Sequence, residues 1–414
     1  MNKKRVVITG IGVIAANGVG VDNFWEACIH GVSGVSWIEH FDASQLNSKI
    51  AAVVKNFNPA DYIPINVVRK TDRFVHLGLA AALMAVGDAQ ISLDLIDRER
   101  AGVIIGSGLG GMMFHEEQIL QGYEKGVHRL NPMCVPKITP NAISGQIAIH
   151  LKMYGPNITI STACSSGTHA IGQAFRMIQN DEIDMAISGG AEAPLTEFNF
   201  GAYDAMQVLS SRNDIPQKAS RPFDKNRDGF VMGEGSGILI LEELGHALKR
   251  NAKIYAEIAG YASTCGAYHM VIPRDDGLDA ARAMHLALKD AGMKPNQVHY
   301  INAHGTSTSH NDRVETKAIK HIFGSYCDKV PISSTKSMIG HTLGAAGAIE
   351  MAICALTIKK NIVHPTINHE ELDPECDLDY IPNIARAKVV DCTISNSFGF
   401  GSSNACIATR RFYD

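Results

Sequence analysis

Segments with strand-like and helix-like patterns alternate along the chain, and the series begins a second time after residue 251. The first series opens with a predicted strand at Arg5–Thr9, and the second opens with a similar strand at Ile254–Tyr261. Such alternation is typical of α/β folds in which helices cover mostly parallel sheets. Two series in the same order indicate an internal duplication. We therefore expect two similar halves, one in residues 1–251 and the other in residues 252–414.

The most informative unit of the first half is Ile158–Asn180. Asn157–Thr162 alternates β-branched and small residues as a strand does, and the residues after Gly167 have helical spacing. Cys164 lies at the turn between them. The free N–H groups at a helix start favour a thiolate there and can lower a cysteine pKa to about 3.5–7.5. On this stretch alone, Cys164 is either a reactive nucleophile or a small buried side chain.

Composition excludes several classes of function. The chain has 38 Lys and Arg against 42 Asp and Glu and no basic block, which argues against nucleic acid or an anionic membrane as partner. Its nine cysteines form no CxxC pair, as is typical of a reducing compartment. A basic start followed by an apolar run imitates a signal peptide. Glycines interrupt that run, however, which favours a strand followed by a turn at Gly10–Gly12. With no stretch of about 18 apolar residues, we expect a cytoplasmic protein without a membrane span.

Two glycine patterns resemble dinucleotide-binding motifs. Gly10, Gly12 and Ala15 fit GxGxxA, and residues 106, 108 and 111 fit GxGxxG. Neither pattern is followed by a strand that ends in an acidic residue about 20 positions later, because Glu39 and Asp42 fall in polar loop. A nicotinamide-dependent oxidoreductase is therefore the weaker alternative, and tight turns explain the glycines better.

An acidic run at residues 224–234 imitates the start of a calcium-binding loop. Asp224, Asn226 and Asp228 occupy loop positions 1, 3 and 5, but Glu234 falls at position 11 instead of 12. The histidines also lack metal-site spacing. We expect no catalytic metal.

Two histidines and a lysine occur in settings like that of Cys164. His304 closes the apolar strand Val298–Ala303 and precedes glycine and hydroxyl residues. His341 lies between glycines, five residues after Lys336, in a segment where Ser337–Thr357 is predicted to be one helix of small residues. Either histidine alone could be structural. Together with a cysteine and a lysine at duplicated turns, they favour a catalytic site.

These blocks closely resemble the signature motifs of the β-ketoacyl-ACP synthases. The matching segments are VVITGIGV at the start, TACSSG (162–167), RPFDKNRDGFVMGEG (221–235), AHGTST (303–308), KSMIGHTLGAAG (336–347) and NSFGFG (396–401). The resemblance runs from end to end. It implies the thiolase fold, with two pseudo-twofold-related halves in five α-β-α-β-α layers. It also implies the decarboxylative Claisen condensation of an acyl-enzyme thioester with malonyl-ACP.

The resemblance assigns a role to each block. Cys164 matches the nucleophile, and its backbone N–H with that of Phe400 matches the oxyanion hole. His304 and His341 match the pair that stabilises the enolate. Lys336 matches a residue that orders the site, paired with Glu350. The remaining matches bind substrate: Thr306 and Thr308 hold the pantetheine arm, Phe400 and Phe398 belong to the gating loop, and Leu109 forms a wall of the acyl pocket.

The resemblance also implies that the protein has no cofactor of its own, because acyl carrier protein presents the substrates on phosphopantetheine. A homodimer is expected, acting as a KAS II-like enzyme in fatty acid elongation. TACSSG and YASTCGAYHM (261–270) resemble ketosynthases of type II polyketide systems more than they resemble fatty-acid enzymes. Those polyketide ketosynthases act with a chain-length partner subunit in a heterodimer. The gate block continues Gly401-Ser402-Ser403-Asn404, where Gly-Gly-Thr-Asn is commoner. A scaffold subunit without activity is disfavoured because Cys164 is present.

Overall fold

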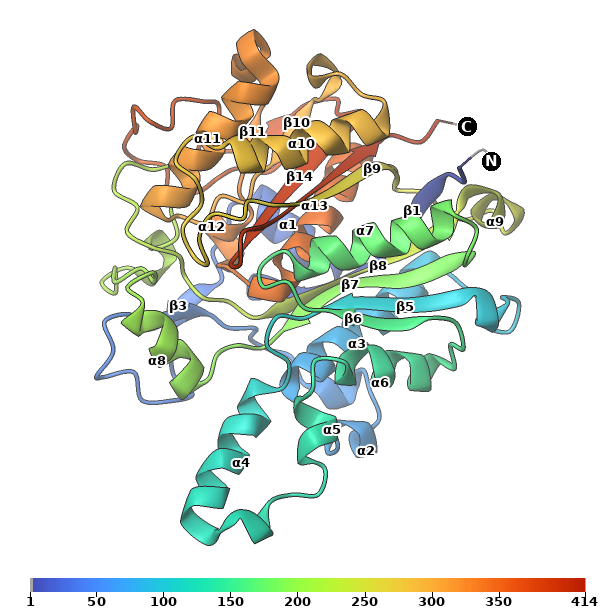
Figure 1. The fold of residues 1–414 in the computed structure, drawn as a ribbon, viewed down its shortest axis with the longest axis vertical. Coiled ribbons are helices and arrows are strands. Elements are labelled where there is room, and N and C mark those ends of the chain that lie inside the picture. The colour runs from blue at the N-terminus through green and yellow to red at the C-terminus, as the bar shows by residue number, and fades with distance from the viewer. Residues whose placement is uncertain (1–2, 414) are drawn as a thin grey trace.

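The computed structural model describes residues 3–413. Its α-helices are α1 (Val21–Ile29), α2 (Ile65–Val68), α3 (Arg73–Ala89), α4 (Met112–Lys125), α5 (Cys134–Ile138), α6 (Ala142–Leu151), α7 (Ser166–Gln179), α8 (Glu197–Ala205), α9 (Leu244–Lys249), α10 (Leu278–Ala291), α11 (Ser309–Phe323), α12 (Lys336–Ile339) and α13 (Ala346–Lys360). Figure 1 shows them around a large twisted sheet, with α4 projecting at one end.

That sheet has 11 strands and includes β1 (Val6–Ala15), β2 (Gly18–Val19), β5 (Ala101–Gly106), β6 (Asn157–Ile160), β7 (Met185–Glu192), β8 (Gly235–Glu243), β9 (Ala256–Cys265), β10 (Tyr300–Asn302), β11 (Ile332–Ser333), β14 (Cys392–Gly399) and β15 (Ser403–Arg410). Two small sheets pair β3 (Val35–Trp37) with β4 (Ile50–Ala52) and β12 (Ile362–Val363) with β13 (Arg386–Ala387).

The strand order repeats between the two ends of the large sheet. It runs β6-β5-β7-β8-β1 in the first half and β11-β10-β14-β15-β9 in the second. If the five strands of each half are ranked 1 to 5 by their order along the chain, both sheet orders read 3-2-4-5-1. The hydrogen-bonding directions repeat too: ranks 3, 2 and 4 are parallel, and ranks 4, 5 and 1 are antiparallel. A short antiparallel contact of β1 with β9, from Val6 to Ile8, joins the halves.

The helices make three layers around the two half-sheets (Figure 1). Helix α3 packs on β1 and β8 outside the first half, and α10 packs on β9 and β15 outside the second. Between the halves, α7 contacts β5 and β7, and α13 contacts β8 and β14. The largest apolar cluster surrounds these two central helices. The layer sequence is therefore α-β-α-β-α, and the predicted α/β fold class is confirmed. The division of the chain at residue 251 stays a prediction.

The sheet is less parallel than the sequence predicts, because two of the four strand pairings in each half are antiparallel. The chain leaves β7 at Glu192 and re-enters β8 at Gly235, and these two residues are directly paired. The connection therefore re-enters the sheet at the end where β7 leaves it, so β8 runs antiparallel to β7 and no crossover is needed. In the second half, β14 and β15 are joined by a tight hairpin between Gly399 and Ser403.

The predicted turn at Gly10–Gly12 is also wrong, because both glycines lie inside β1. A Cβ on Gly10 would lie 2.3 Å from the carbonyl oxygen of Ala85, and one on Gly12 would lie 1.9 Å from that of Ala81. Both carbonyls belong to α3. The glycines therefore let α3 approach the strand closely, and this approach explains the GxGxxA pattern.

The helix predicted over Ser337–Thr357 is interrupted. Helix α12 ends at Ile339, a 3₁₀ turn covers Leu343–Ala345, and α13 begins at Ala346. Gly340 has a φ of 65°, which a side chain rarely adopts, and the N–H of His341 donates to Val231 O at 2.7 Å instead of continuing the helix. The break aims His341 at the functional site.

Candidate active site

One cavity of about 380 Å³ brings together most of the residues singled out from the sequence. Cys164, His304, His341, Thr306, Thr308, Phe398 and Phe400 all line it. The first of these comes from the first half and the others from the second. The lining of the cavity is more apolar than polar and includes Tyr203, Phe230 and Leu343. A long apolar chain with one polar end is the ligand shape that such a lining accommodates.

Cys164 lies at a strained turn between β6 and α7. The preceding residue, Ala163, has a φ of 50°, and α7 begins at Ser166 behind the N-cap Ser165. The Ser166 hydroxyl bridges the turn by donating to Ala163 O at 2.6 Å and accepting from Thr162 N at 2.9 Å. This turn fixes the sulfur at the cavity wall.

The expected low pKa of Cys164 is wrong for this structure. Burial raises the pKa of the thiol to about 12, although the Lys336 charge and the backbone N–H groups of Phe400 and Cys164 act to lower it. Cys164 precedes the N-cap and is only 7% exposed, so loss of water outweighs the helix terminus. The same two N–H groups lie beside the sulfur, where they could donate to the oxygen of a carbonyl carbon bonded to it.

The rings of His304 and His341 pack edge to face at the cavity, with centroids 5.4 Å apart and planes at 86°. Burial, followed by the Lys336 charge, holds the pKa of both imidazoles well below the usual 6.5. Both rings are therefore neutral at physiological pH. A neutral imidazole keeps one N–H, so each ring can still donate one hydrogen bond to an oxygen.

Lys336 lies behind His304, fully buried and paired with Glu350. Its ammonium group donates to the carbonyl of His304 at 2.7 Å and lies 3.5 Å from His304 Nδ1. Because an ammonium only donates, Nδ1 must act as the acceptor, and the ring proton belongs on Nε2.

Two buried carboxylates that sequence reasoning missed hold the segment after His304. Glu315 accepts from the N–H groups of His304 and Gly305 at 2.9 and 2.8 Å, and Asp312 accepts from those of Thr306 and Ser307 at 3.0 and 3.1 Å. Burial raises the pKa of Glu315 to about 7. In the sequence, the sign of these two carboxylates is a pair of acidic residues, three positions apart, on the face of α11 that is otherwise apolar.

Thr306 and Thr308 lie side by side at the cavity, with their hydroxyl oxygens 2.9 Å apart. Phe398 packs edge-on against His304, with ring centroids 5.5 Å apart. Phe400 is half-buried and belongs to none of the apolar clusters, as a mobile ring would require. Leu109 differs from the prediction: it packs against the apolar cluster that contains Cys164 but does not line the cavity.

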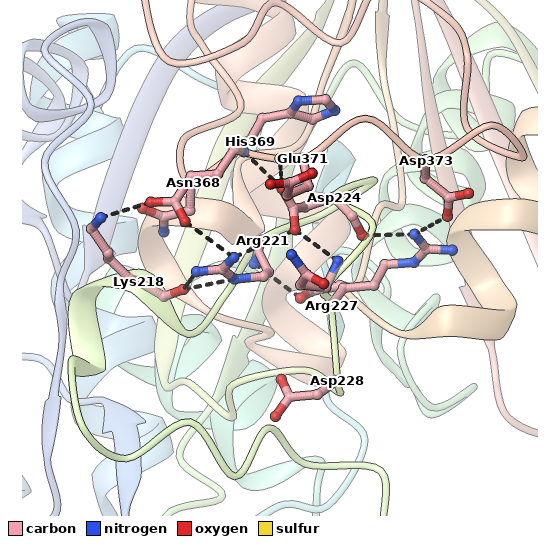
Figure 2. Close-up of polar contacts among 12 residues, drawn as sticks. Lys218, Arg221, Asp224, Arg227, Asp228, Asn368, His369, Glu371 and Asp373 are labelled. Atoms are coloured by element: carbon pink, nitrogen blue, oxygen red, sulfur yellow. Dashed lines mark hydrogen bonds and ion pairs between the residues drawn. The ribbon is translucent and has the colours of Figure 1, made fainter.

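Figure 2 shows a buried ionic network built around Arg221, Asp224 and Arg227. Arg227 donates to the backbone carbonyls of Thr308 and Ser309 at 3.2 and 3.0 Å and pairs with Asp373. Asp224 pairs with Arg221 and accepts from the N–H groups of residues 226, 370 and 371 at 2.7–2.8 Å. The network ties residues 218–228 and 368–373 to the start of α11, and thereby fixes the backbone at Thr308.

This network also accounts for the acidic run that imitates a calcium loop. The Asp224 carboxylate is occupied by internal hydrogen bonds, and Glu234 pairs with Arg73 through a bidentate contact of 2.6 and 2.7 Å. Across residues 3–413, no three His, Cys, Asp or Glu side chains are grouped as metal ligands. No helix in the same range is long and apolar enough to cross a membrane.

Two family models match the chain. The Beta-ketoacyl synthase, N-terminal domain, covers residues 3–247, and the Beta-ketoacyl synthase, C-terminal domain, covers residues 255–370. Together they include Cys164 and both histidines.

Curated relatives match over the full length. The chain is 46% identical over 412 residues to 3-oxoacyl-[acyl-carrier-protein] synthase 2 of Synechocystis, covering 100% of this chain and 99% of that protein. It is 46% identical over 414 residues to the Coxiella burnetii protein of the same name, covering 100% of both.

Solved structures with the same architecture include other ketosynthases. One is a type II acyl-carrier protein in complex with its ketosynthase bound to the hexaketide (TM-score 0.92, 38% identity, 99% of this chain and 100% of that one). Another is the ishigamide ketosynthase/chain length factor (TM-score 0.93, 35% identity, the same coverage).

Proposed function

The chain belongs to the β-ketoacyl synthase family, and from that membership we propose that its cavity carries out the condensation of acyl and malonyl thioesters in fatty acid elongation. The single observation that carries the proposal is the meeting of Cys164, His304 and His341 in one apolar cavity. The full-length similarity to 3-oxoacyl-[acyl-carrier-protein] synthase 2 supports the same reaction.

In the first step the acyl group moves from the carrier's pantetheine to Cys164. The Cys164 sulfur forms a bond to the thioester carbonyl carbon, the bond from that carbon to the pantetheine sulfur breaks, and the thiol proton leaves with the pantetheine. The N–H groups of Cys164 and Phe400 receive the oxyanion; one such donor contributes about 10²–10³ in rate. Because the resting thiol is neutral, the step includes a proton transfer as well as sulfur attack.

In the second step malonyl thioester loses carbon dioxide, and its α-carbon attacks the acyl group on Cys164. The electron pair of the broken carboxyl bond passes through an enolate, whose oxygen needs hydrogen-bond donors. His304 and His341 supply them as neutral rings, and Lys336 keeps the His304 proton on Nε2. Cys164 leaves as the sulfur of the broken thioester and takes one proton from solvent, which balances the negative charge of the malonyl carboxylate that departs as carbon dioxide.

The rest of the site binds the two ends of the substrate. Thr306 and Thr308 hold the pantetheine arm at the polar rim, where Arg227 fixes the backbone. The apolar interior takes the acyl chain, and Phe400 closes over it. No cofactor is needed beyond the phosphopantetheine that acyl carrier protein brings. We place the reaction in the cytoplasm, where all nine cysteines would remain free thiols.

The assembly we propose is a homodimer. The curated relatives are more similar to this chain than the polyketide ketosynthases are, which favours fatty acid elongation over the type II polyketide alternative. The alternative requires a chain-length partner subunit in a heterodimer. Condensation by the purified chain alone would decide between them.

The reaction is tested by intact-mass analysis after mixing the protein with a panel of acyl-ACPs, followed by malonyl-ACP. We expect a mass increase equal to one acyl group on Cys164 and none in Cys164→Ala. His304→Ala and His341→Ala should still load but condense about 10²-fold or more slowly. His128→Ala, at an exposed position, serves as control. Wild-type condensation by both cavity variants would show that the histidines are structural.

A further inference from the structure

One buried carboxylate, that of Glu192, hydrogen-bonds to segments from both halves of the chain. Glu192 is the last residue of β7 and is 0% exposed. Its Oε1 accepts from the Ser107 hydroxyl at 3.0 Å and from Leu109 N at 3.1 Å, and its Oε2 accepts from Gly108 N at 2.6 Å. Gly344 N donates to the same Oε2 at 3.1 Å. Three partners therefore come from the first half, and Gly344 comes from the second.

The first-half partners pack directly against the turn that carries Cys164. A Cβ on Gly108 would lie 3.0 Å from Glu192 Oε2 and 3.7 Å from the carbonyl oxygen of Ala163, in that turn. The Ser161 hydroxyl donates to Gly108 O at 3.2 Å. Gly108 thus fits between the carboxylate and the nucleophile turn, and its lack of a side chain permits the fit.

The second-half partner follows a strained residue. Leu343 lines the cavity two residues after His341, and its φ is 45°, in the left-handed region that bulky side chains rarely adopt. Such a conformation persists only where the surrounding structure holds it. The bond from the next N–H, that of Gly344, to Glu192 is part of that support. A Cβ on Gly344 would lie 2.3 Å from Glu192 Oε2, so a larger residue there would displace the carboxylate.

The two segments meet around the nucleophile. Leu343 belongs to the same buried apolar cluster as Cys164, and Leu109 packs against that cluster. A Cβ on Gly167, in the first turn of α7, would lie 2.9 Å from the carbonyl oxygen of Gly344. A shift of either segment would therefore change the immediate surroundings of the Cys164 turn.

The bonds of Glu192 require an acceptor at both oxygens. Burial raises the pKa of Glu192, and the N–H groups of Gly108 and Leu109 act to lower it. A proton on either oxygen would meet a backbone N–H, so the ionised form suits the geometry. An amide does not suit it in either orientation, because its NH₂ group would face Leu109 N or Gly108 N. Glu192→Gln is therefore nearly isosteric but loses at least one of these bonds.

We propose that Glu192 is a positioning residue that holds the Cys164 turn and the segment of His341 in fixed relative positions across the two halves. The inference rests on the proposed condensation, in which the acyl group on Cys164 meets an enolate bound by His341. Loading of Cys164 does not involve His341, whereas condensation does. Because a small displacement of reacting groups slows a reaction strongly, Glu192 acts mainly on the condensation step.

The test compares Glu192→Gln with Glu242→Gln in the full-length protein. Glu242 is a matched control because it is equally buried on the adjacent strand β8, and its bonds go to Thr9 and Arg250, which do not line the cavity. Each variant is first loaded from an acyl-ACP, and intact mass gives the fraction of chains acylated on Cys164. Condensation is then measured per acylated chain, in a single turnover with malonyl-ACP.

We expect Glu192→Gln to load Cys164 at close to the parent rate but to condense at least about tenfold more slowly per loaded chain. A loss of folded protein would lower the loaded fraction without changing that rate, so the two effects separate. Glu242→Gln should melt earlier yet condense like the parent per loaded chain. Parent-like condensation by loaded Glu192→Gln, or an equal loss in both variants, would overturn the proposal.

Glu192→Asp is a milder change that decides the question if the glutamine variant does not fold. It keeps the charge but withdraws both oxygens by one carbon, so condensation should again slow more than loading. Hydrogen exchange on this variant needs no substrate: peptides covering residues 107–109 and 342–345 should both lose protection. Parent-like protection at 342–345 would overturn the proposal, because the second half would then not depend on Glu192. If the parent itself forms no condensation product, the proposed function fails, while the exchange result still decides whether Glu192 holds the two segments.

Discussion

His169 on α7 is a buried imidazole outside the reaction itself. Its Nδ1 lies 2.7 Å from the Thr162 hydroxyl, and its Nε2 has no hydrogen-bond partner among the described residues. Burial lowers the pKa of His169 to about 4. Below the unfolded value of about 6.5, the unfolded chain therefore binds a proton that the folded chain does not, and stability falls as pH falls towards 4.

Replacing His169 by Gln should remove this acid sensitivity. As pH falls from 6.5 to 4, the free energy of unfolding of the variant should rise relative to that of the parent. The difference should grow by about 1.4 kcal/mol per pH unit and reach about 3 kcal/mol at pH 4. Urea unfolding midpoints at a series of pH values would measure the difference. His128→Gln, at an exposed imidazole, should track the parent. Parallel pH curves for His169→Gln and the parent would mean that the ring is protonated when folded.

At the scale of single residues, short blocks around Cys164, His304, His341 and Lys336 identified chemistry that the structure brings together. The same blocks could not predict the raised pKa of Cys164, because desolvation depends on distant segments that close over the thiol. Glu315 was missed for a similar reason. The carboxylate of Glu315 accepts hydrogen bonds from backbone N–H groups, and the positions of these groups are defined only by the folded loop. No side-chain pattern in the sequence predicts such bonds.

The contact between β1 and α3 offers a sharp test at the scale of elements. Gly12→Ala would place a Cβ 1.9 Å from Ala81 O, so the strand or the helix must move. We expect the free energy of unfolding of Gly12→Ala to fall by about 3 kcal/mol or more, with a clearly lower melting temperature. Gly87→Ala is the matched change within α3, where a Cβ meets nothing within 4 Å. It should stabilise the protein by about 0.5–1 kcal/mol. Equal melting temperatures for the two variants would contradict the close approach.

Elements with a clear apolar period were predicted well. The helix expected after Gly167 is present as α7, which spans Ser166–Gln179 and buries the apolar residues of that segment. The break at Gly340 and the glycines inside β1 were missed. In both cases the residue type is dictated by a neighbour that comes close in space, and local periodicity carries no record of that neighbour.

At the scale of the whole molecule, the large sheet ends at β6 with an open edge. Asn157 and Ile158 are exposed, and the sheet continues on one side only, to β5. Pro156 O accepts from Val103 N of β5, and Ile160 O accepts from Ser107 N just after β5. By the alternation of a ladder, the backbone groups of residues 157 and 159 therefore face outwards. Open edges of this kind pair readily with another strand, and a second copy would supply one.

Thr159→Pro tests whether this edge forms the proposed homodimer. Proline removes the outward N–H and leaves the ladder to β5 in place. We expect light scattering to give twice the chain mass of 44.6 kDa for the parent and a shift towards one chain for the variant. Ser92→Pro, in an exposed loop, controls for proline itself. An unchanged dimer in Thr159→Pro would place the interface elsewhere.

The repeated strand order has a consequence for how the chain could be connected. Strand β9 opens the second half, and its Glu257 binds Arg5 from the beginning of the chain and Arg410 from the end, each at 2.6 Å. The two ends therefore converge on the strand where the halves meet (Figure 1). A short linker from one end to the other, with a new opening near residue 251, would give a circular permutant in which the histidine half is synthesised before the cysteine half. Because the cavity draws on both halves at their shared boundary, its geometry would not depend on which half comes first.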